Sequence, residues 1–168
     1  MPVLSSIAIS YDSKEDRVLA VINPGRAETW SCWLTRRLVL AFLERVPQFL
    51  AGTSPLAQRG PGEYRGELVA FEREAALTTT AKAMTATPNE VLKTGATAAE
   101  LAERLTIAGQ GDGFRFELHG YGGGGATGVM TRAELQRVLR MLEVAIQNAG
   151  WVSPAPTPAA ASTRPVAH

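Results

Sequence analysis

The sequence predicts an α+β fold: two antiparallel β-meander and helix units, about residues 5–50 and 103–150, packed as one compact domain with the helices on the sheet face. Three observations support this class. Apolar residues alternate in short segments, an apolar stripe with helical spacing follows each group of segments, and the two groups align without a gap. The 168 residues, 45% hydrophobic and 20% charged, suit one compact globular domain.

The first unit opens with three predicted strands, at residues 7–11, 17–22 and 28–34, where apolar and small polar residues alternate. A helix should follow. Pro47 is expected to end or kink it, because proline removes a backbone donor and clashes with the preceding turn. The apolar face of this helix has helical spacing and comprises Leu38, Val39, Phe42, Leu43 and Val46.

The connector between the units, residues 51–102, should be partly helical. Thr97 and Glu100 fit a capping box and predict that a short helix begins there. The rest of the connector is expected to form a loop over 51–66, a helix over 67–84 and irregular chain over 85–96.

The second unit repeats the order of the first. Thr131 and Glu134 form a capping box that should open its helix. The domain is expected to span residues 1–152, and the Pro/Ala-rich tail, residues 153–168, is expected to be disordered. The predicted strands lie at 105–107, at 114–118 and before Met130, with a glycine-rich turn over 121–128.

The two units share one register. Thr35 and Thr131 lie 96 positions apart (131 − 35), and the arginines that follow them, Arg36 and Arg132, have the same offset. Apolar positions of two strands and a helix fall on one another at this offset, which predicts an internal duplication. Pairing two copies would cover a sheet edge that one unit leaves open.

The same alignment reveals a difference between the units. The outward strand positions Arg115 and Glu117 of the second unit are charged, whereas Leu19 and Val21 occupy them in the first. The strand of the first unit is therefore apolar on both faces, so both faces must be covered.

Two tryptophans belong to the same region. Trp30 and Trp33 are three positions apart in a strand, so they should point to opposite faces. The cover of the second apolar face is either the connector around residues 68–84, a second copy of the chain or a different protein. The predicted partner-binding residues are Leu19, Val21, Trp30 and Trp33.

The glycine string Gly123-x-Gly125-x-x-Gly128 matches a dinucleotide fingerprint by spacing alone. That fingerprint needs a strand, a glycine turn and a helix within a βαβ unit. Here the alignment of the units places the string in a hairpin turn, so we expect no nucleotide cofactor.

Catalytic and metal-binding residue sets are sparse. The histidines are His119 and His168, too few for a zinc site of three or four ligands or for a convincing triad. The single cysteine, Cys32, excludes an intramolecular disulfide and should behave as a small buried hydrophobe. We therefore expect a protein that is not an enzyme and that has no cofactor or metal.

Arginine follows threonine at both predicted helix starts. Arg36, Arg37 and Arg132 lie where the helix dipole is already positive, so these corners could bind phosphate or a carboxylate. The alternative is that each arginine turns back to an internal acid such as Asp12.

These patterns favour a protein–protein binding module, either a homodimer or a subunit of a larger complex. The duplicated meander and helix resembles the topology of single-stranded nucleic-acid binders of the whirly, PC4 and PUR-repeat kind, which makes single-stranded DNA or RNA the alternative partner. That alternative would use Arg26, Arg36, Arg37, Arg115, Tyr121 and Arg132.

The N-terminus lacks a basic region followed by an apolar stretch, and no apolar run approaches the length of a membrane span. We therefore expect a cytoplasmic protein without membrane contacts. The net charge of +1 provides no overall field toward nucleic acid or membrane.

Overall fold

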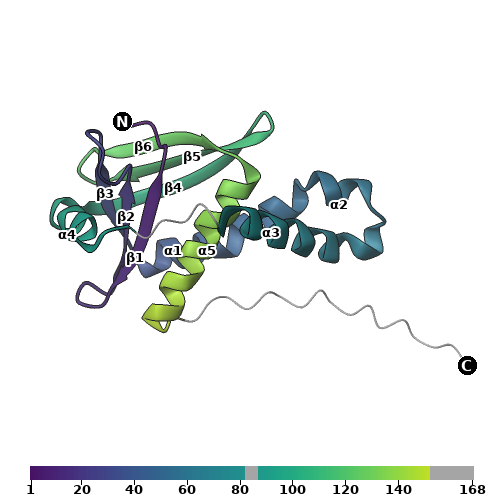
Figure 1. Ribbon diagram of the computed structural model, residues 1–168, viewed down its shortest axis with the longest axis horizontal. Coiled ribbons are helices and arrows are strands. Elements are labelled where there is room, and N and C mark those ends of the chain that lie inside the picture. Colours follow the sequence, from purple (N-terminus) through teal and green to yellow (C-terminus); the bar gives the residue numbers. More distant parts are fainter. Residues whose placement is uncertain (82–86, 152–168) are drawn as a thin grey trace, which may run out of the picture.

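The computed structural model describes residues 1–81 and 87–151, and its fold is α+β, as predicted. One mixed sheet of six strands carries helices on both faces, and α2 and α3 extend away from it as a helical arm (Figure 1). The tail predicted to be disordered lies outside the described residues. The strands are β1 (Ile7–Asp12), β2 (Arg17–Ile22), β3 (Trp30–Leu34), β4 (Glu100–Gln110), β5 (Gly113–Gly120) and β6 (Gly125–Met130).

The helices fall into two groups. One helix follows each half of the sheet, and the others lie in the connector. Their bounds are α1 (Arg36–Gly52), α2 (Pro55–Arg59), the 3₁₀ turn η1 (Gly62–Tyr64), α3 (Arg65–Ala81), α4 (Asn89–Ala98) and α5 (Arg132–Ala149).

The strands follow one another across the sheet in chain order, from β1 to β6. Neighbours within the first three and within the last three are antiparallel. The central pair is parallel and short, with Cys32 opposite Glu100 and Trp33 opposite Leu101. The connector therefore brings the chain back to the end of the sheet at which β3 begins, and β4 starts there.

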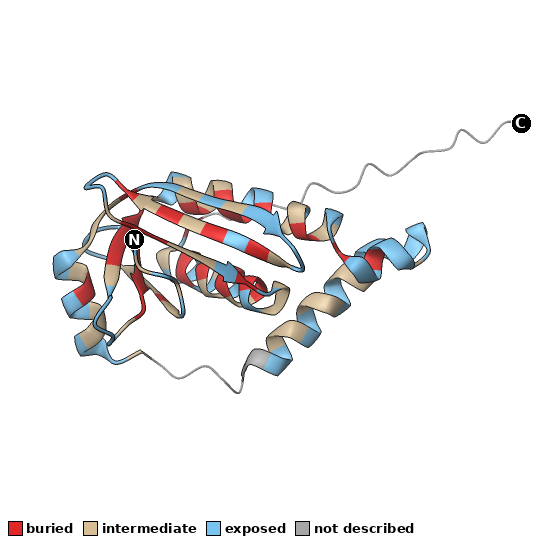
Figure 2. Cartoon of the chain, turned by 90° about the horizontal axis from the view of Figure 1, so that it is seen from above, coloured by how far each residue is buried: buried red, intermediate tan, exposed pale blue. Residues whose placement is uncertain are grey.

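The main core lies between the sheet and the helices α1 and α5. Alternate residues of β2 and β5 point into it, so Ile22 and Phe116 are almost fully buried and belong to one cluster with Leu135 and Leu139 of α5. Figure 2 shows buried positions along the strands and on the helices that cover this face. Thr35 and Thr131 cap these helices by accepting hydrogen bonds from the backbone N–H groups of Leu38 and Glu134, respectively.

Local signals for the ends of two helices differ from the structure. Helix α1 does not end at Pro47 but continues to Gly52, and Val46 and Leu50 on either side of the proline are buried in the core. Thr97 does not open a helix. It lies in the last turn of α4, and the chain then enters β4 because Glu100 and Leu101 pair with β3.

The connector is also more regular than predicted. Residues 51–66, expected as a loop, contain the end of α1, α2 and η1. Residues 85–96, expected as irregular chain, contain most of α4. Proline opens α2 at Pro55 and precedes α4 at Pro88, positions where its missing N–H costs little, so the prolines mark helix starts rather than loops.

Within the described residues, no helix is both long and apolar enough to cross a membrane.

Candidate functional site

The second apolar face of the first three strands is covered by α4. Leu19, Val21 and Trp33 form a small buried cluster with Ala8, and the side chain of Leu92 from α4 packs against it. Ser31 donates a 2.7 Å hydrogen bond to the carbonyl of Gly95, which fixes the helix on the sheet. The covering segment is therefore α4, further along the chain than the residues 68–84 considered from the sequence.

Trp30 lies elsewhere, at the glycine-rich turn between β5 and β6. Its indole Nε1 donates to Glu100 at 2.7 Å, and the backbone N–H of Gly122 donates to the same carboxylate. A side chain at Gly120 or Gly124 would overlap Glu100. The glycines thus provide space for a carboxylate of the same chain, which is a structural reason for the glycine run.

A groove lies between the two outermost strands of the sheet, β1 and β6. It has a volume of about 660 Å³ and is bordered by β1, the end of β6 and one face of α5. The side chains that line it include Ile7, Ile9, Val129, Arg137, Met141 and Val144. We call it the seam groove.

Backbone groups on both borders of the seam groove have no strand partner in the described part of the chain. The Asn23 N–H donates to the Ser6 carbonyl at 2.9 Å. Because hydrogen-bonded pairs alternate along an antiparallel ladder, Ile7 and Ile9 direct their N–H and C=O groups away from β2. On the opposite border, the backbone N–H and C=O groups of Thr127 pair with the N-terminal segment, on the side of β6 away from β5. Because backbone directions repeat every two residues along a strand, the N–H and C=O groups of Val129 point to the same side, where the described residues provide no partner strand.

The N-terminal segment closes one end of the seam groove. It pairs with β6 through Leu4, whose N–H donates to the Thr127 carbonyl at 2.8 Å, and then crosses to β2. Asn23 holds the crossing point. Its Oδ1 accepts from the N–H groups of Ser5 and Ser6 and from the Ser5 hydroxyl, and its Nδ2 donates to the Val3 carbonyl at 2.8 Å.

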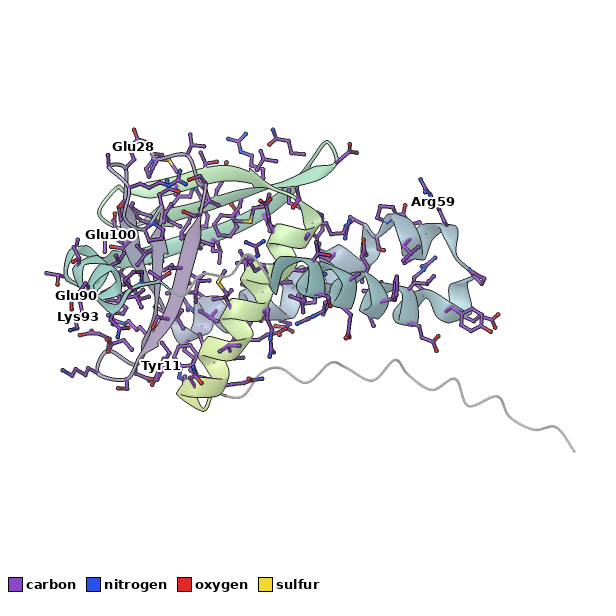
Figure 3. All side chains as sticks on the ribbon, viewed as in Figure 1. Tyr11, Glu28, Arg59, Glu90, Lys93 and Glu100 are labelled. Carbon is purple, nitrogen blue, oxygen red and sulfur yellow. The ribbon has the colours of Figure 1, made fainter. Side chains whose placement is uncertain are left out.

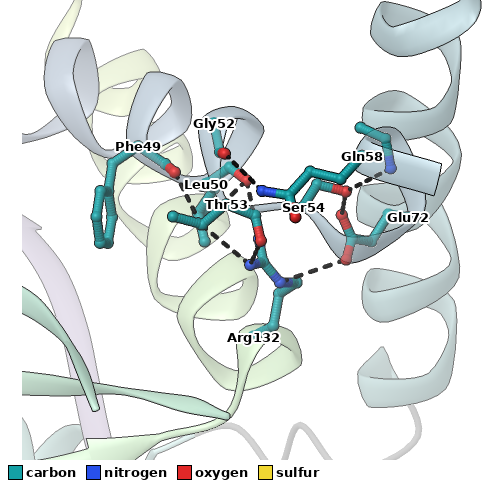
Figure 4. A network of polar contacts seen from close by, with 9 residues as sticks. Phe49, Leu50, Gly52, Thr53, Ser54, Gln58, Glu72 and Arg132 are labelled. Atoms are coloured by element: carbon teal, nitrogen blue, oxygen red, sulfur yellow. Dashed lines mark hydrogen bonds and ion pairs between the residues drawn. The ribbon is translucent and has the colours of Figure 1, made fainter. Parts of the chain in front are cut away.

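The two Thr-Arg corners differ in their contacts. Arg132 donates to the carbonyls of Leu50 and Thr53 at 2.9 and 2.7 Å and lies 3.3 Å from a carboxylate oxygen of Glu72, so it joins α5 to α1 and α3 (Figure 4). Arg36 is exposed and stacks on the Trp151 ring at 5.9 Å. At Arg132 the structure thus has the alternative considered from the sequence, an arginine that turns back to an internal acid, and the acid is Glu72.

We expect Arg132→Ala to lower the free energy of unfolding by about 2 kcal/mol, because the partly buried carbonyl of Leu50 and the carboxylate of Glu72 lose their donor. Urea denaturation measures the change. Arg36→Ala is the matched control at the equivalent corner and should leave the urea midpoint nearly unchanged, since its side chain is exposed. Equal effects of the two substitutions would contradict the difference in their roles.

The remaining residues of the predicted nucleic-acid surface are exposed, and their contacts are local. Arg115 pairs with Glu117 of its own strand at 2.7 Å. Arg26 lies in the turn after β2, Arg37 in the first turn of α1, and Tyr121, 68% exposed, in the glycine-rich turn. No basic cluster with an aromatic platform is formed by contacts among these residues.

Cys32 is fully buried on β3. Burial, with a smaller contribution from the charge of Glu100, raises the pKa of its thiol to about 12, so it stays protonated and unreactive at neutral pH. The side chain acts as part of the core, in agreement with its apolar setting in the sequence.

Figure 3 labels charged side chains on opposite sides of the molecule. Arg59 is at the far end of the helical arm, whereas Glu90 and Lys93 are on α4, beyond the opposite side of the sheet. The arm also exposes apolar side chains, with Phe71 66% and Tyr64 49% accessible.

Sequence reasoning missed the seam groove. Its borders are strand edges, and which strands are outermost depends on the order of strands in the sheet. One signal was present: Arg137, Met141 and Val144 form a second stripe on α5 beside its core-facing residues.

Comparisons with known proteins give no relative: no family model, no curated protein sequence and no solved structure matches this chain.

Proposed function

We propose that this chain is a non-catalytic protein–protein binding module that accepts an extended segment of another protein in the seam groove. The observation that carries the proposal is an apolar groove bordered by backbone groups of Ile7, Ile9 and Val129 that have no strand partner among residues 1–81 and 87–151. An extended segment would satisfy those groups by main-chain hydrogen bonds, which is how peptides add to an exposed sheet edge.

The size of the groove favours a short segment over a folded surface. A volume of about 660 Å³ lies in the range of sites that hold small ligands. The edge of β1 is flanked by α5 and by the end of β6, which would hinder the approach of a second sheet edge. These features favour an extended peptide over a folded domain as the occupant of the groove.

The apolar face predicted from the sequence is a weaker candidate for this role. Leu19, Val21 and Trp33 are at most 8% exposed under α4, so a partner could reach them only after α4 had moved. The seam groove needs no such movement. The internal duplication also remains a proposal, and it is supported by the equivalent caps of Thr35 and Thr131.

The test is selection of peptides from a displayed library of random 12-residue sequences, with the full chain as bait. We expect selected peptides to bind saturably and to slow amide hydrogen exchange at Ile7, Ile9 and Val129. Val144→Asp should weaken binding at least about tenfold, because burial of an apolar side chain contributes about 1.5–3 kcal/mol.

Leu56→Asp is the matched control. Leu56 and Val144 are both 39% exposed, but Leu56 lies on the helical arm outside the groove. Binding should be unchanged in this variant. Failure to select any peptide, or protection at amides elsewhere, would overturn the proposal. A dimer abolished by Val144→Asp would also overturn it, since a second copy would then occupy the groove.

Single-stranded DNA and RNA serve as negative probes in the same series. Phosphate-driven binding falls steeply as salt rises, whereas strand addition into an apolar groove should persist. Salt-sensitive binding of labelled oligonucleotides with no peptide selected would favour the alternative partner.

A further inference from the structure

Arg137 is a basic side chain in the wall of the seam groove that has no partner among the described residues. Its Nε is buried and makes no hydrogen bond, and no ion pair involves its guanidinium. The neighbouring charges in the wall are engaged elsewhere. Arg140 lies 3.6 Å from Glu143, and the carboxylate of Glu134 accepts from the Thr131 N–H and hydroxyl.

A buried donor without an acceptor is unfavourable, and native structures contain few of them. A guanidinium is best satisfied by a carboxylate, which can accept two parallel hydrogen bonds from it. The unpaired Arg137 therefore indicates which chemistry is complementary to this wall.

We propose that Arg137 binds a carboxylate side chain of the extended segment that enters the seam groove, and so selects acidic partners. The inference rests on the proposed function, since it concerns the ligand of the same groove. It adds a chemical requirement that the apolar lining alone would not impose.

The spacing of the wall residues defines the segment further. Arg137 and Met141 are four residues apart on α5, about 6 Å along the helix axis. Side chains two residues apart on one face of a strand are separated by about 6.6 Å. A segment that runs along α5 with its carboxylate on Arg137 would thus place the side chain two positions away against Met141. The expected pattern is an acidic and an apolar residue separated by one position.

The experiment uses peptides selected from the random library and compares each with a version in which its acidic residue is replaced by the amide, Glu by Gln or Asp by Asn. We expect the amide version to bind about tenfold or more weakly to the natural chain, because hydrogen bonds to charged groups contribute about 1.5–3 kcal/mol. Arg137→Gln should weaken the acidic peptide by a similar factor and leave the amide version nearly unchanged.

Arg140→Gln is the control on the same helix. It removes a charge that also lines the groove but is already paired with Glu143, so acidic and amide peptides should keep their difference in affinity. The peptide comparison needs no altered protein, so it holds even where a variant folds poorly.

The outcomes separate the two proposals. Peptides that protect Ile7 and Ile9 but show no acidic preference would overturn the role of Arg137 and leave strand addition intact. If no peptide binds at all, both proposals fail. An equal loss of affinity for acidic and amide peptides in Arg137→Gln would also overturn carboxylate recognition.

Discussion

Replacement of Asn23 by alanine is expected to lower the free energy of unfolding by about 3–5 kcal/mol. The side chain is 4% exposed and makes hydrogen bonds to three residues of the N-terminal segment, so its loss leaves several partly buried polar groups unpaired, each costing about 1–3 kcal/mol. Its backbone is also left-handed, at φ 51°, where alanine is less favourable than asparagine. Urea denaturation measures the loss.

Asn23→Gly separates the two causes, since glycine tolerates the left-handed backbone and lacks only the side chain. Most of the loss should remain in this variant. Hydrogen exchange at Leu4, whose N–H bonds to Thr127, should become faster in both variants because the N-terminal segment is released from β6. A loss below about 1 kcal/mol in Asn23→Ala would show that the crossing does not depend on this side chain.

Gly95→Leu is expected to displace α4 from the sheet and to lower the free energy of unfolding by about 4 kcal/mol. A Cβ at Gly95 would lie 2.7 Å from Cγ2 of Val21, a stiff branched side chain, and a leucine would need far more space. Lifting the helix partly exposes Leu19, Val21 and Trp33, and complete exposure of one apolar side chain costs about 1.5–3 kcal/mol. A red shift of tryptophan fluorescence and binding of an apolar dye should accompany the loss.

Gly66→Leu is the matched control, because a Cβ at Gly66 in α3 meets no atom within 4 Å. It should not destabilise the fold. A milder pair, Gly95→Ala and Val21→Ala, tests the contact itself: the double variant should be more stable than the sum of the single losses predicts, by about 1 kcal/mol, since the smaller side chain makes room for the added methyl. Strict additivity would contradict direct packing.

The sequence predicted best which face of a strand or helix is buried, because the spacing of apolar residues alone decides this. The alternation through Val18, Ala20 and Ile22 is that of a strand with one core face, and these residues are buried in the main core. The helical stripe that includes Leu135 and Leu139 likewise faces the sheet. The same periodicity placed the apolar residues Leu19 and Val21 on the second face of the strand, and so predicted that this face must be covered.

Local signals failed where distant pairing or burial outweighed them. The capping pattern at Thr97 describes only four residues, whereas pairing with Cys32 and Trp33 draws the following residues into β4. Pro47 lacks one hydrogen bond, but burial of its neighbours Val46 and Leu50 holds α1 together.

The candidate site was beyond prediction for a related reason. Asn23 was recognisable as a turn residue, but the three residues to which its side chain makes four hydrogen bonds lie near the N-terminus, and nothing in the local sequence indicates them. Arg137 was visible as a charge on a helix. That it lacks an acceptor depends on which acids of other elements come near it.

By itself, the sequence determined the α+β class, the faces of β2 and β5 and the need to cover Leu19 and Val21, because these follow from the two-residue period of strands and the helical period of apolar stripes. Only the tertiary structure decided that α4 provides the cover, that β3 and β4 join in parallel, and that β1 and β6 leave a groove between them. Strand order and helix placement depend on the sum of contacts between distant residues, and no local pattern encodes that sum.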